Sequence, residues 1–298
     1  MAASTPAQLK LATESEHRSE FSQGWRRFSA NRMAMGGLIT ALLLCVMAIF
    51  AESIAPYDPI KDAFSGMRGA SPSADHWFGA DHIGRDLLSR VIFGTRIALI
   101  VGLVSTLISV VIGVTIGAAA GYFGGWTDTI LSRLIDTLMA FPIIGLLIVL
   151  AAVRGPSLST TVLVIGATTW ARLARVVRAD VMSLRERDFV TAAQSIGVKD
   201  ARIIWRHILP NVLGPVIVLA SLGIGGIIIL EAALSFLGLG VRPPTPSWGR
   251  TLADGRDSIT RFPHISIFPG IMIMLTVLAF NFIGDGLRDA LDPRQRAE

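Results

Sequence analysis

Lysine is almost missing from this 298-residue chain, which contains only Lys10, Lys61 and Lys199. None of the three follows a glycine, so the glycine-rich loop that cradles nucleotide phosphates is missing, and we expect no ATP hydrolysis by this chain itself. The single cysteine, Cys45, cannot form an internal disulfide and is expected to be a small buried apolar residue. Gly-x-Ser-x-Gly, His-Glu-x-x-His and Cys/His zinc patterns are missing too. We therefore predict no catalytic residue, no metal site and no cofactor in this chain.

Charged residues are scarce as well. They make up 16% of the chain against 52% hydrophobic residues, and the mean hydropathy of +0.58 is too high for a soluble domain. A membrane-crossing helix needs about 17 to 25 residues with little charge. We predict an all-α membrane protein with six transmembrane helices, at about residues 33–55, 97–121, 129–153, 158–178, 211–234 and 265–285.

The net charge of +5 could suggest a nucleic-acid partner, but the basic residues cluster beside the predicted spans. Arginines precede the first span and follow the last, and a larger group lies between the fourth and fifth spans. Basic residues favour the cytoplasmic side of a membrane. We therefore predict cytoplasmic termini, a cytoplasmic loop at 180–210, outer loops at 56–96 and 235–264, and no nucleic-acid partner.

The first residues are polar and rich in Ala, Ser, Thr and Glu, which predicts a disordered cytoplasmic tail over 1–23. Residues 24–32 mix aromatic residues with arginine, which favours a short helix in the membrane interface. An anchoring belt of Trp and Arg explains the same composition. The transmembrane domain then covers 33–298. The first span is the expected insertion signal, because the polar stretch before it fits no cleavable one.

The segment from Asp188 to Pro210 is a polar and cationic insertion between two apolar runs. Its first half predicts a short helix with Asp188 as N-cap and an apolar face. Gly197 supplies the left-handed residue that ends this helix. Asp200 is expected to cap a second helix through Ile208, ended or continued by Pro210. We predict that a partner protein holds this elbow through one set of residues: Phe189, Thr191, Ala192, Ala193, Ile196, Gly197, Asp200, Arg206, Leu209 and Pro210.

The paired alanines, the glycine and the later Leu-Pro of this segment resemble the EAA loop of permease subunits of ATP-binding-cassette importers. The run from Arg206 to Asn211 is similar to the dipeptide and oligopeptide branch, in the subunit of C type. The glutamate that names the loop is Thr191 in this chain. A salt bridge from that position is therefore not expected. An ordinary cytoplasmic loop is the alternative reading of the segment.

Three further segments resemble the same branch and extend the likeness over most of the chain. They are the outer run from His76 to Asp86, the run Glu231 to Gly240 with the Pro-rich loop after it, and the tail from Gly284 to Arg294. His76, Asp81, His82 and Asp86 lack the spacing of a metal site, so we expect structural capping. Residues 87–96 predict an amphipathic helix on the outer surface.

Glu231 is an acid near the outer end of an otherwise uncharged span. Such a residue, with Ser235 beside it, suggests either the translocation path or a structural pair with an arginine of a neighbouring helix or subunit. Arg133 and Asp136 are spaced to pair within one helix. Pro142 predicts a kink in the third span, and Gly214, Gly223, Gly225 and Gly226 predict close helix packing along the fifth.

The resemblance implies a type I importer (MetI-like) permease fold in a bacterial inner membrane. It also implies a second, homologous permease subunit, which forms a heterodimer with this chain. Either two ATP-binding subunits or one fused ATPase would bind ATP and Mg. The remaining implied partners are an extracytoplasmic substrate-binding protein and membrane lipid. The expected function is uptake of dipeptides or oligopeptides. Nickel complexes or another small solute are alternative cargoes. An ATP-independent secondary transporter or channel is the competing class, and an integral membrane enzyme is disfavoured by the missing motifs.

Overall fold

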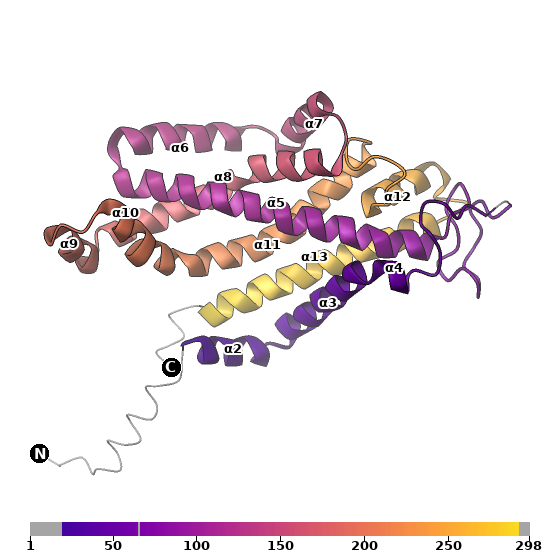
Figure 1. Cartoon of the computed structure of the whole chain (residues 1–298), viewed down its shortest axis with the longest axis horizontal. Coiled ribbons are helices and arrows are strands. Elements are labelled where there is room, and N and C mark those ends of the chain that lie inside the picture. Colours follow the sequence, from indigo (N-terminus) through magenta and orange to yellow (C-terminus); the bar gives the residue numbers. More distant parts are fainter. Residues whose placement is uncertain (1–19, 65, 292–298) are drawn as a thin grey trace, which may run out of the picture.

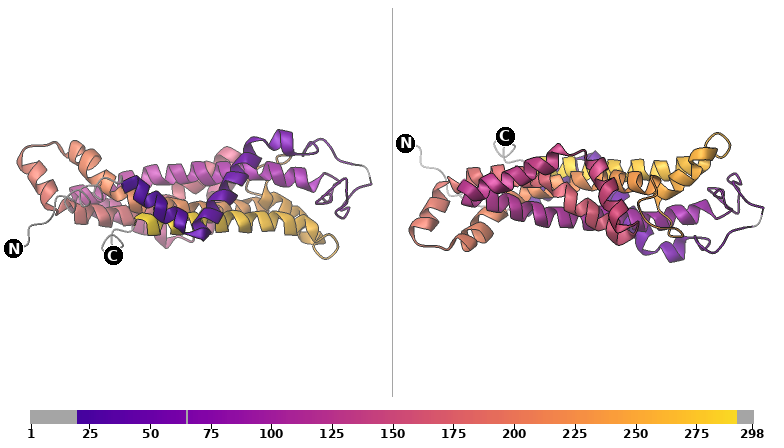
Figure 2. Two further views of the ribbon diagram at one scale, coloured as in Figure 1. Left: turned by 90° about the horizontal axis from the view of Figure 1, so that it is seen from below. Right: turned by 90° about the horizontal axis from the view of Figure 1, so that it is seen from above.

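The computed structural model describes residues 20–64 and 66–291, and this part of the chain is almost entirely helical. The bundle is long and narrow (Figures 1 and 2). The helices are α2 (Glu20–Ala30), α3 (Arg32–Ile49), α4 (Ala51–Ile54), α5 (Leu87–Phe123), α6 (Gly125–Ala140), α7 (Ile143–Arg154), α8 (Leu158–Arg185), α9 (Asp188–Ser195), α10 (Asp200–Ile203), α11 (Leu209–Phe236), α12 (Trp248–Gly255) and α13 (His264–Leu291). A π-helical turn (Ile204–Ile208) joins α10 to α11, and a 3₁₀ turn (Arg256–Ser258) follows α12.

Four helical stretches in the described residues are long and apolar enough to cross a membrane. They are α3, α5, the continuous stretch Asp200–Phe236 and α13. The pair α6 and α7 would form a fifth span if its two halves are taken together. Helix α8 is long but carries arginines through its second half. The six-span count therefore stays a prediction.

The two ends of the bundle carry different structures. Helices α9 and α10 form an elbow at one end, while α12 and the loop before α5 lie at the other (Figures 1 and 2). Helix α2 packs beside the last turns of α13, where Asn31 Nδ2 donates to Asp289 Oδ2 at 3.4 Å. Most of the predicted tail lies outside the described residues. Its last residues, 20–23, are already helical and belong to α2.

Helix α5 is longer than the predicted second span. Asp86 caps it by accepting a hydrogen bond from the Ser89 backbone N–H, and Gly124, at φ +66°, ends it. The predicted helix at 87–96 is present, but its predicted position on the outer surface is wrong. Those residues form the first turns of α5, and Leu87, Arg90 and Val91 are buried there. Burial of Arg90 is possible because the carboxylates of Asp81 and Asp254 neutralise its charge.

Glycines on α5 allow α8 to approach closely. A Cβ on Gly117 would come within 2.6 Å of the Ala174 carbonyl oxygen, and one on Gly121 within 2.6 Å of the Arg178 carbonyl oxygen. The four glycines that were predicted to allow close helix packing lie on α11, and three of them face no neighbouring helix. A Cβ on Gly214, Gly223 or Gly226 would meet nothing within 4 Å, and only Gly225 faces a neighbouring helix, α13.

The chain breaks between α6 and α7 at Phe141 and Pro142, where the two helices meet at 91°. This confirms the predicted kink at Pro142. The predicted pair of Arg133 with Asp136 is wrong, because Asp136 accepts from Arg175 Nη2 of α8 at 2.6 Å. Asp128 likewise binds the guanidinium of Arg178 through both carboxylate oxygens. Charge pairing therefore fixes α6 to α8.

Candidate functional site

The elbow is built as two short helical arms around Gly197. Its φ of +76° confirms the predicted left-handed conformation. The predicted caps are wrong: Arg187 and Lys199 occupy the N-cap positions, and neither side chain makes a capping hydrogen bond. Asp188 and Asp200 are the first helical residues instead. Their negative charges still favour the positive N-terminal ends of the two helices.

One side of the elbow packs against the bundle. Val190, Ala193 and Ile203 are buried in a cluster with Val177 and Val181 of α8. Sequence reasoning placed Ala193 on the surface offered to a partner. The structure shows that this alanine is 8% exposed and turned toward its own chain.

The opposite side of the elbow is apolar and exposed. Phe189 is 43% exposed, Ile196 81% and Trp205 74%. Thr191 and Ala192 are also exposed, and the Thr191 hydroxyl donates to the Arg187 backbone carbonyl at 3.4 Å. Sequence reasoning did not include Trp205, although an exposed tryptophan among basic residues was a usable signal. The elbow thus presents apolar side chains at the tip of the molecule.

Tyr122, in the last turn of α5, joins the two arms of the elbow. Its hydroxyl donates to Asp200 Oδ1 at 2.7 Å and accepts from Gln194 Nε2 at 3.5 Å. Tyr122 itself is 4% exposed. Since Gln194 belongs to the first arm and Asp200 to the second, this one side chain ties both arms to α5. No local pattern in the sequence pointed to it.

The second arm of the elbow has no break before α11. Leu209 and Pro210 stand in the first turn of α11, so the chain is helical from Asp200 to Phe236. Pro210 lacks a backbone N–H inside this continuous stretch, and the π-helical turn directly before it is the local adjustment that accommodates such a proline. Arg206 lies exposed in the π-helical turn. A displacement of the elbow is therefore a displacement of α11.

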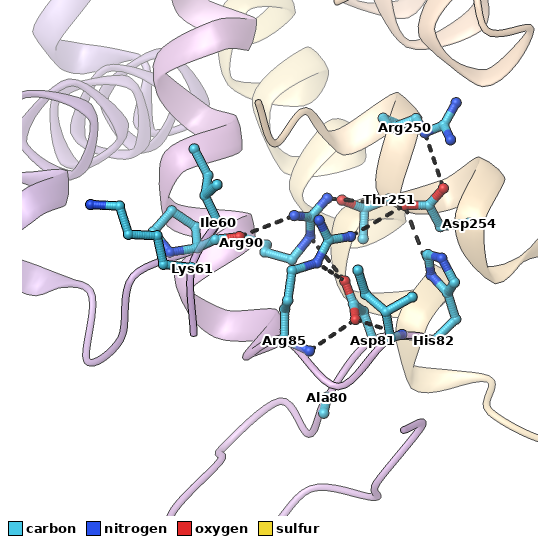
Figure 3. Close-up of polar contacts among 12 residues, drawn as sticks. Ile60, Lys61, Ala80, Asp81, His82, Arg85, Arg90, Arg250, Thr251 and Asp254 are labelled. Carbon is cyan, nitrogen blue, oxygen red and sulfur yellow. Dashed lines mark hydrogen bonds and ion pairs between the residues drawn. The ribbon is translucent and has the colours of Figure 1, made fainter. Parts of the chain in front are cut away.

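At the other end of the molecule, buried charges join the loop before α5 to α12. Arg85 Nε lies 2.7 Å and Arg90 Nε 3.3 Å from Asp81 Oδ2. Both guanidinium groups also reach Asp254 of α12, at 3.9 and 4.0 Å, and Arg250 contacts Asp254 at 3.0 Å. Figure 3 shows Arg85 and Arg90 between the two carboxylates, with Arg250 on the far side of Asp254. We call Asp81, Arg85, Arg90, Arg250 and Asp254 the α12 charge cluster.

The acids of the His76 to Asp86 segment have the predicted capping role. Asp86 accepts hydrogen bonds from Ser89 at the start of α5 and lies 2.9 Å from His76 Nδ1. Asp81 accepts from the backbone N–H groups of Ile83 and Arg85. His82 lies 4.0 Å from Asp254. In the described part of the chain, no group of three or more His, Cys, Asp or Glu side chains is arranged to hold a metal ion.

Glu231 is buried near the end of α11 that lies beside α12. It is 1% exposed and accepts a hydrogen bond from Ser235 Oγ at 2.7 Å. Within the described residues it has no arginine partner. Gly249 of α12 closes over the same turns, since a Cβ there would lie 2.3 Å from the Ala232 carbonyl oxygen. Glu231 and Ser235 are thus enclosed by protein.

A cavity of about 660 Å³ lies elsewhere, between α5, the α6–α7 break, α8 and α11. Its polar lining comes from α5 and α8, and the α6–α7 break contributes Phe141. Neither Glu231 nor Ser235 is among the described residues that line it. The polar lining residues are Thr106, Ser109, Thr168, Thr169 and Arg172.

Comparison with known proteins gives two family matches. The family described as "binding-protein-dependent transport system inner membrane component" matches residues 113–297. The family described as "N-terminal TM domain of oligopeptide transport permease C" matches residues 19–72.

Two relatives match nearly the whole chain. One is the glutathione transport system permease protein GsiD of Escherichia coli, 42% identical over 286 residues, with 96% of this chain and 94% of the relative covered. The other is the dipeptide transport system permease protein DppC of Alkalihalophilus pseudofirmus, 43% identical over 279 residues, with 94% and 91% covered.

Among solved structures, the MetNI methionine ABC transporter in inward-facing conformations contains a similar chain. The TM-score is 0.56 at 17% identity, over 69% of this chain and 98% of that chain. At this level of identity the likeness concerns the fold alone.

Proposed function

Because this chain belongs to the family of inner membrane components of binding-protein-dependent transport systems, we propose that it is a permease subunit forming half of a translocation path for dipeptides and oligopeptides. The relatives named for dipeptide and glutathione transport support the peptide cargo. The proposed partners are a second, homologous permease subunit, two ATP-binding subunits or one fused ATPase, and an extracytoplasmic binding protein. ATP and Mg bind to the ATPase partners.

The elbow carries this proposal. Its exposed face, with Phe189, Ile196 and Trp205, suits a groove on an ATPase subunit, and the basic residues around it suit an acidic rim. When ATP closes the ATPase subunits, the elbow moves with the subunit that holds it. Its second arm is continuous with α11, and Tyr122 links both arms to α5. The displacement therefore reaches two long helices, which rock as rigid bodies and alternate the access of the path.

Reconstitution of the complete complex tests the function. The chain is co-purified with its partners and placed in proteoliposomes, with loaded binding protein outside and ATP inside. We expect uptake of a radiolabelled dipeptide that stops when the ATPase cannot hydrolyse ATP. Uptake of a nickel complex but not of peptides would show that the cargo is a nickel complex rather than a peptide. Failure of any ATPase subunit to co-purify would favour the competing class of secondary transporters and channels.

A further inference from the structure

Three arginines follow one another at three-residue intervals along α8. Arg175 pairs with Asp136 at 2.6 Å, and Arg178 pairs with Asp128, both acids on α6. Arg172 is different, because its side chain forms no hydrogen bond or ion pair with any residue in the described ranges 20–64 and 66–291. The helix thus carries two arginines bound to protein carboxylates and a third whose donors are free.

Arg172 lines the cavity at the α6–α7 break. Of the described residues that line it, Arg172 alone carries a charge, and the lining includes no aspartate or glutamate. The cavity is also kept open on the α11 side. Gly223 and Gly226 belong to its lining, and a Cβ on either would meet nothing within 4 Å. Its volume of about 660 Å³ is within the range of about 300 to 1,000 Å³ that is usual for small-molecule sites.

A free guanidinium in an apolar cavity favours an anion. Arginine presents a planar fork of donors that matches a carboxylate with two parallel hydrogen bonds. Arg172 is an exposed residue of α8, so its guanidinium is accessible to a ligand that enters the cavity. An ammonium group would find no acid in this lining. The site therefore distinguishes the two ends of a zwitterionic peptide.

We propose that the cavity at the α6–α7 break binds the cargo during its passage, with the cargo carboxylate on Arg172 and the amino end unrecognised. This inference rests on the proposed function as a peptide permease. It deepens that function by assigning an anion-selective site to the permease itself, separate from the recognition made by the binding protein.

The test measures equilibrium binding of radiolabelled alanyl-alanine to the purified complex without its binding protein. Competitors are unlabelled alanyl-alanine, its C-terminal amide and its N-acetyl form. We expect the amide to compete at least about tenfold more weakly than the free acid, because it cannot accept a charge-assisted pair of hydrogen bonds. The acetylated form should compete as well as the free acid.

Variants then assign the effect to one side chain. Arg172→Gln should weaken binding of the free acid by at least about tenfold and abolish its advantage over the amide, while Arg172→Lys should retain part of that advantage. Arg175→Gln is the matched control, since it removes an arginine one turn away that is already paired with Asp136. In that variant the preference for the free acid over the amide should persist.

Three results would overturn the inference. They are no measurable binding at millimolar peptide, equal competition by acid and amide in the wild-type complex, and loss of the second permease subunit from the Arg172→Gln complex. The last result would show that Arg172 pairs with the neighbouring subunit. Failure of the proposed function is a separate observation, because it appears as missing ATP-driven uptake in the wild-type complex.

Discussion

Tyr122 is the residue whose substitution best separates the transmission of movement from the elbow to α5 from the stability of the fold. Tyr122→Phe keeps the buried ring but loses the hydrogen bonds to Asp200 and Gln194. We expect fewer peptides moved per ATP hydrolysed, with a stability loss of only about 1 kcal/mol. The measurement is the ratio of uptake to ATPase rate in proteoliposomes, alongside the melting temperature in detergent.

Asp200→Ala serves as the partner variant for Tyr122→Phe. If both act through the same hydrogen bond, the double variant should lose no more coupling than either single variant. Additive losses would mean that the bond between Tyr122 and Asp200 does not carry the effect.

Asp81 is the central acid of the α12 charge cluster. It is fully buried and contacts both Arg85 and Arg90. Asp81→Asn should destabilise the protein by about 3 to 5 kcal/mol, because two buried guanidinium groups lose a neutralising partner. Thermal unfolding in detergent checks this. Asp257→Asn, which alters an exposed pair with Arg256, should leave the melting temperature unchanged. Similar melting temperatures for the two variants would contradict the role given to the cluster.

At the scale of helices, the approach of α5 to α8 depends on glycine. Gly117→Ala places a methyl group 2.6 Å from the Ala174 carbonyl oxygen, a backbone atom that cannot rotate away. The two helices must move apart, and we expect a loss of about 1 to 3 kcal/mol. The melting temperature of the purified chain measures it.

Gly214→Ala is the matched control on α11. Open space surrounds that position, and alanine is the better helix former by about 1 kcal/mol. Its melting temperature should therefore stay the same or rise. If Gly117→Ala behaved in the same way, the close contact of α5 with α8 would be refuted.

The local features at Gly197 and Pro142 were predictable from sequence, and the long-range contacts were not. Gly197 and Pro142 act on their own backbone, so their effects follow from residue type alone. The extension of α5 over Leu87 to Arg96 escaped prediction because Arg90 is neutralised in part by Asp254, far away in the chain. The same applies to Asp136, whose partner is Arg175 of another helix rather than Arg133. Spacing within one helix cannot reveal partners on a second helix.

At the scale of the whole molecule, the sequence motifs predicted the protein family but not the three-dimensional arrangement of the cavity. The predicted membership of the peptide permease family is confirmed by the family matches and by relatives at 42 and 43% identity. The cavity and the free Arg172 were not predictable, because the cavity is assembled from four separate parts of the chain. The site roles of the elbow residues remain predictions.

The predicted orientation of the whole chain in the membrane can be tested directly. The predicted orientation places the elbow in the cytoplasm and the Pro-rich loop outside, following the distribution of arginine. A reporter enzyme fused after Lys199 should be active only inside the cell, and one fused after Thr245 only outside. The reverse pattern would contradict both the orientation and the coupling proposal.

Under the proposed function, nucleotide-driven force enters the chain through the elbow. Gly197 stands at φ +76° with no atom within 4 Å of its missing Cβ, so a substitution there changes only backbone preference. Gly197→Val should strain the elbow by about 1 to 3 kcal/mol, whereas Gly197→Asn tolerates the left-handed conformation.

The decisive measurement is therefore the number of peptides transported per ATP hydrolysed by the reconstituted complex carrying each variant. We predict that Gly197→Val assembles and hydrolyses ATP but transports far less peptide per ATP, while Gly197→Asn stays near the wild-type ratio. A wild-type ratio in Gly197→Val would show that the elbow does not couple the two processes.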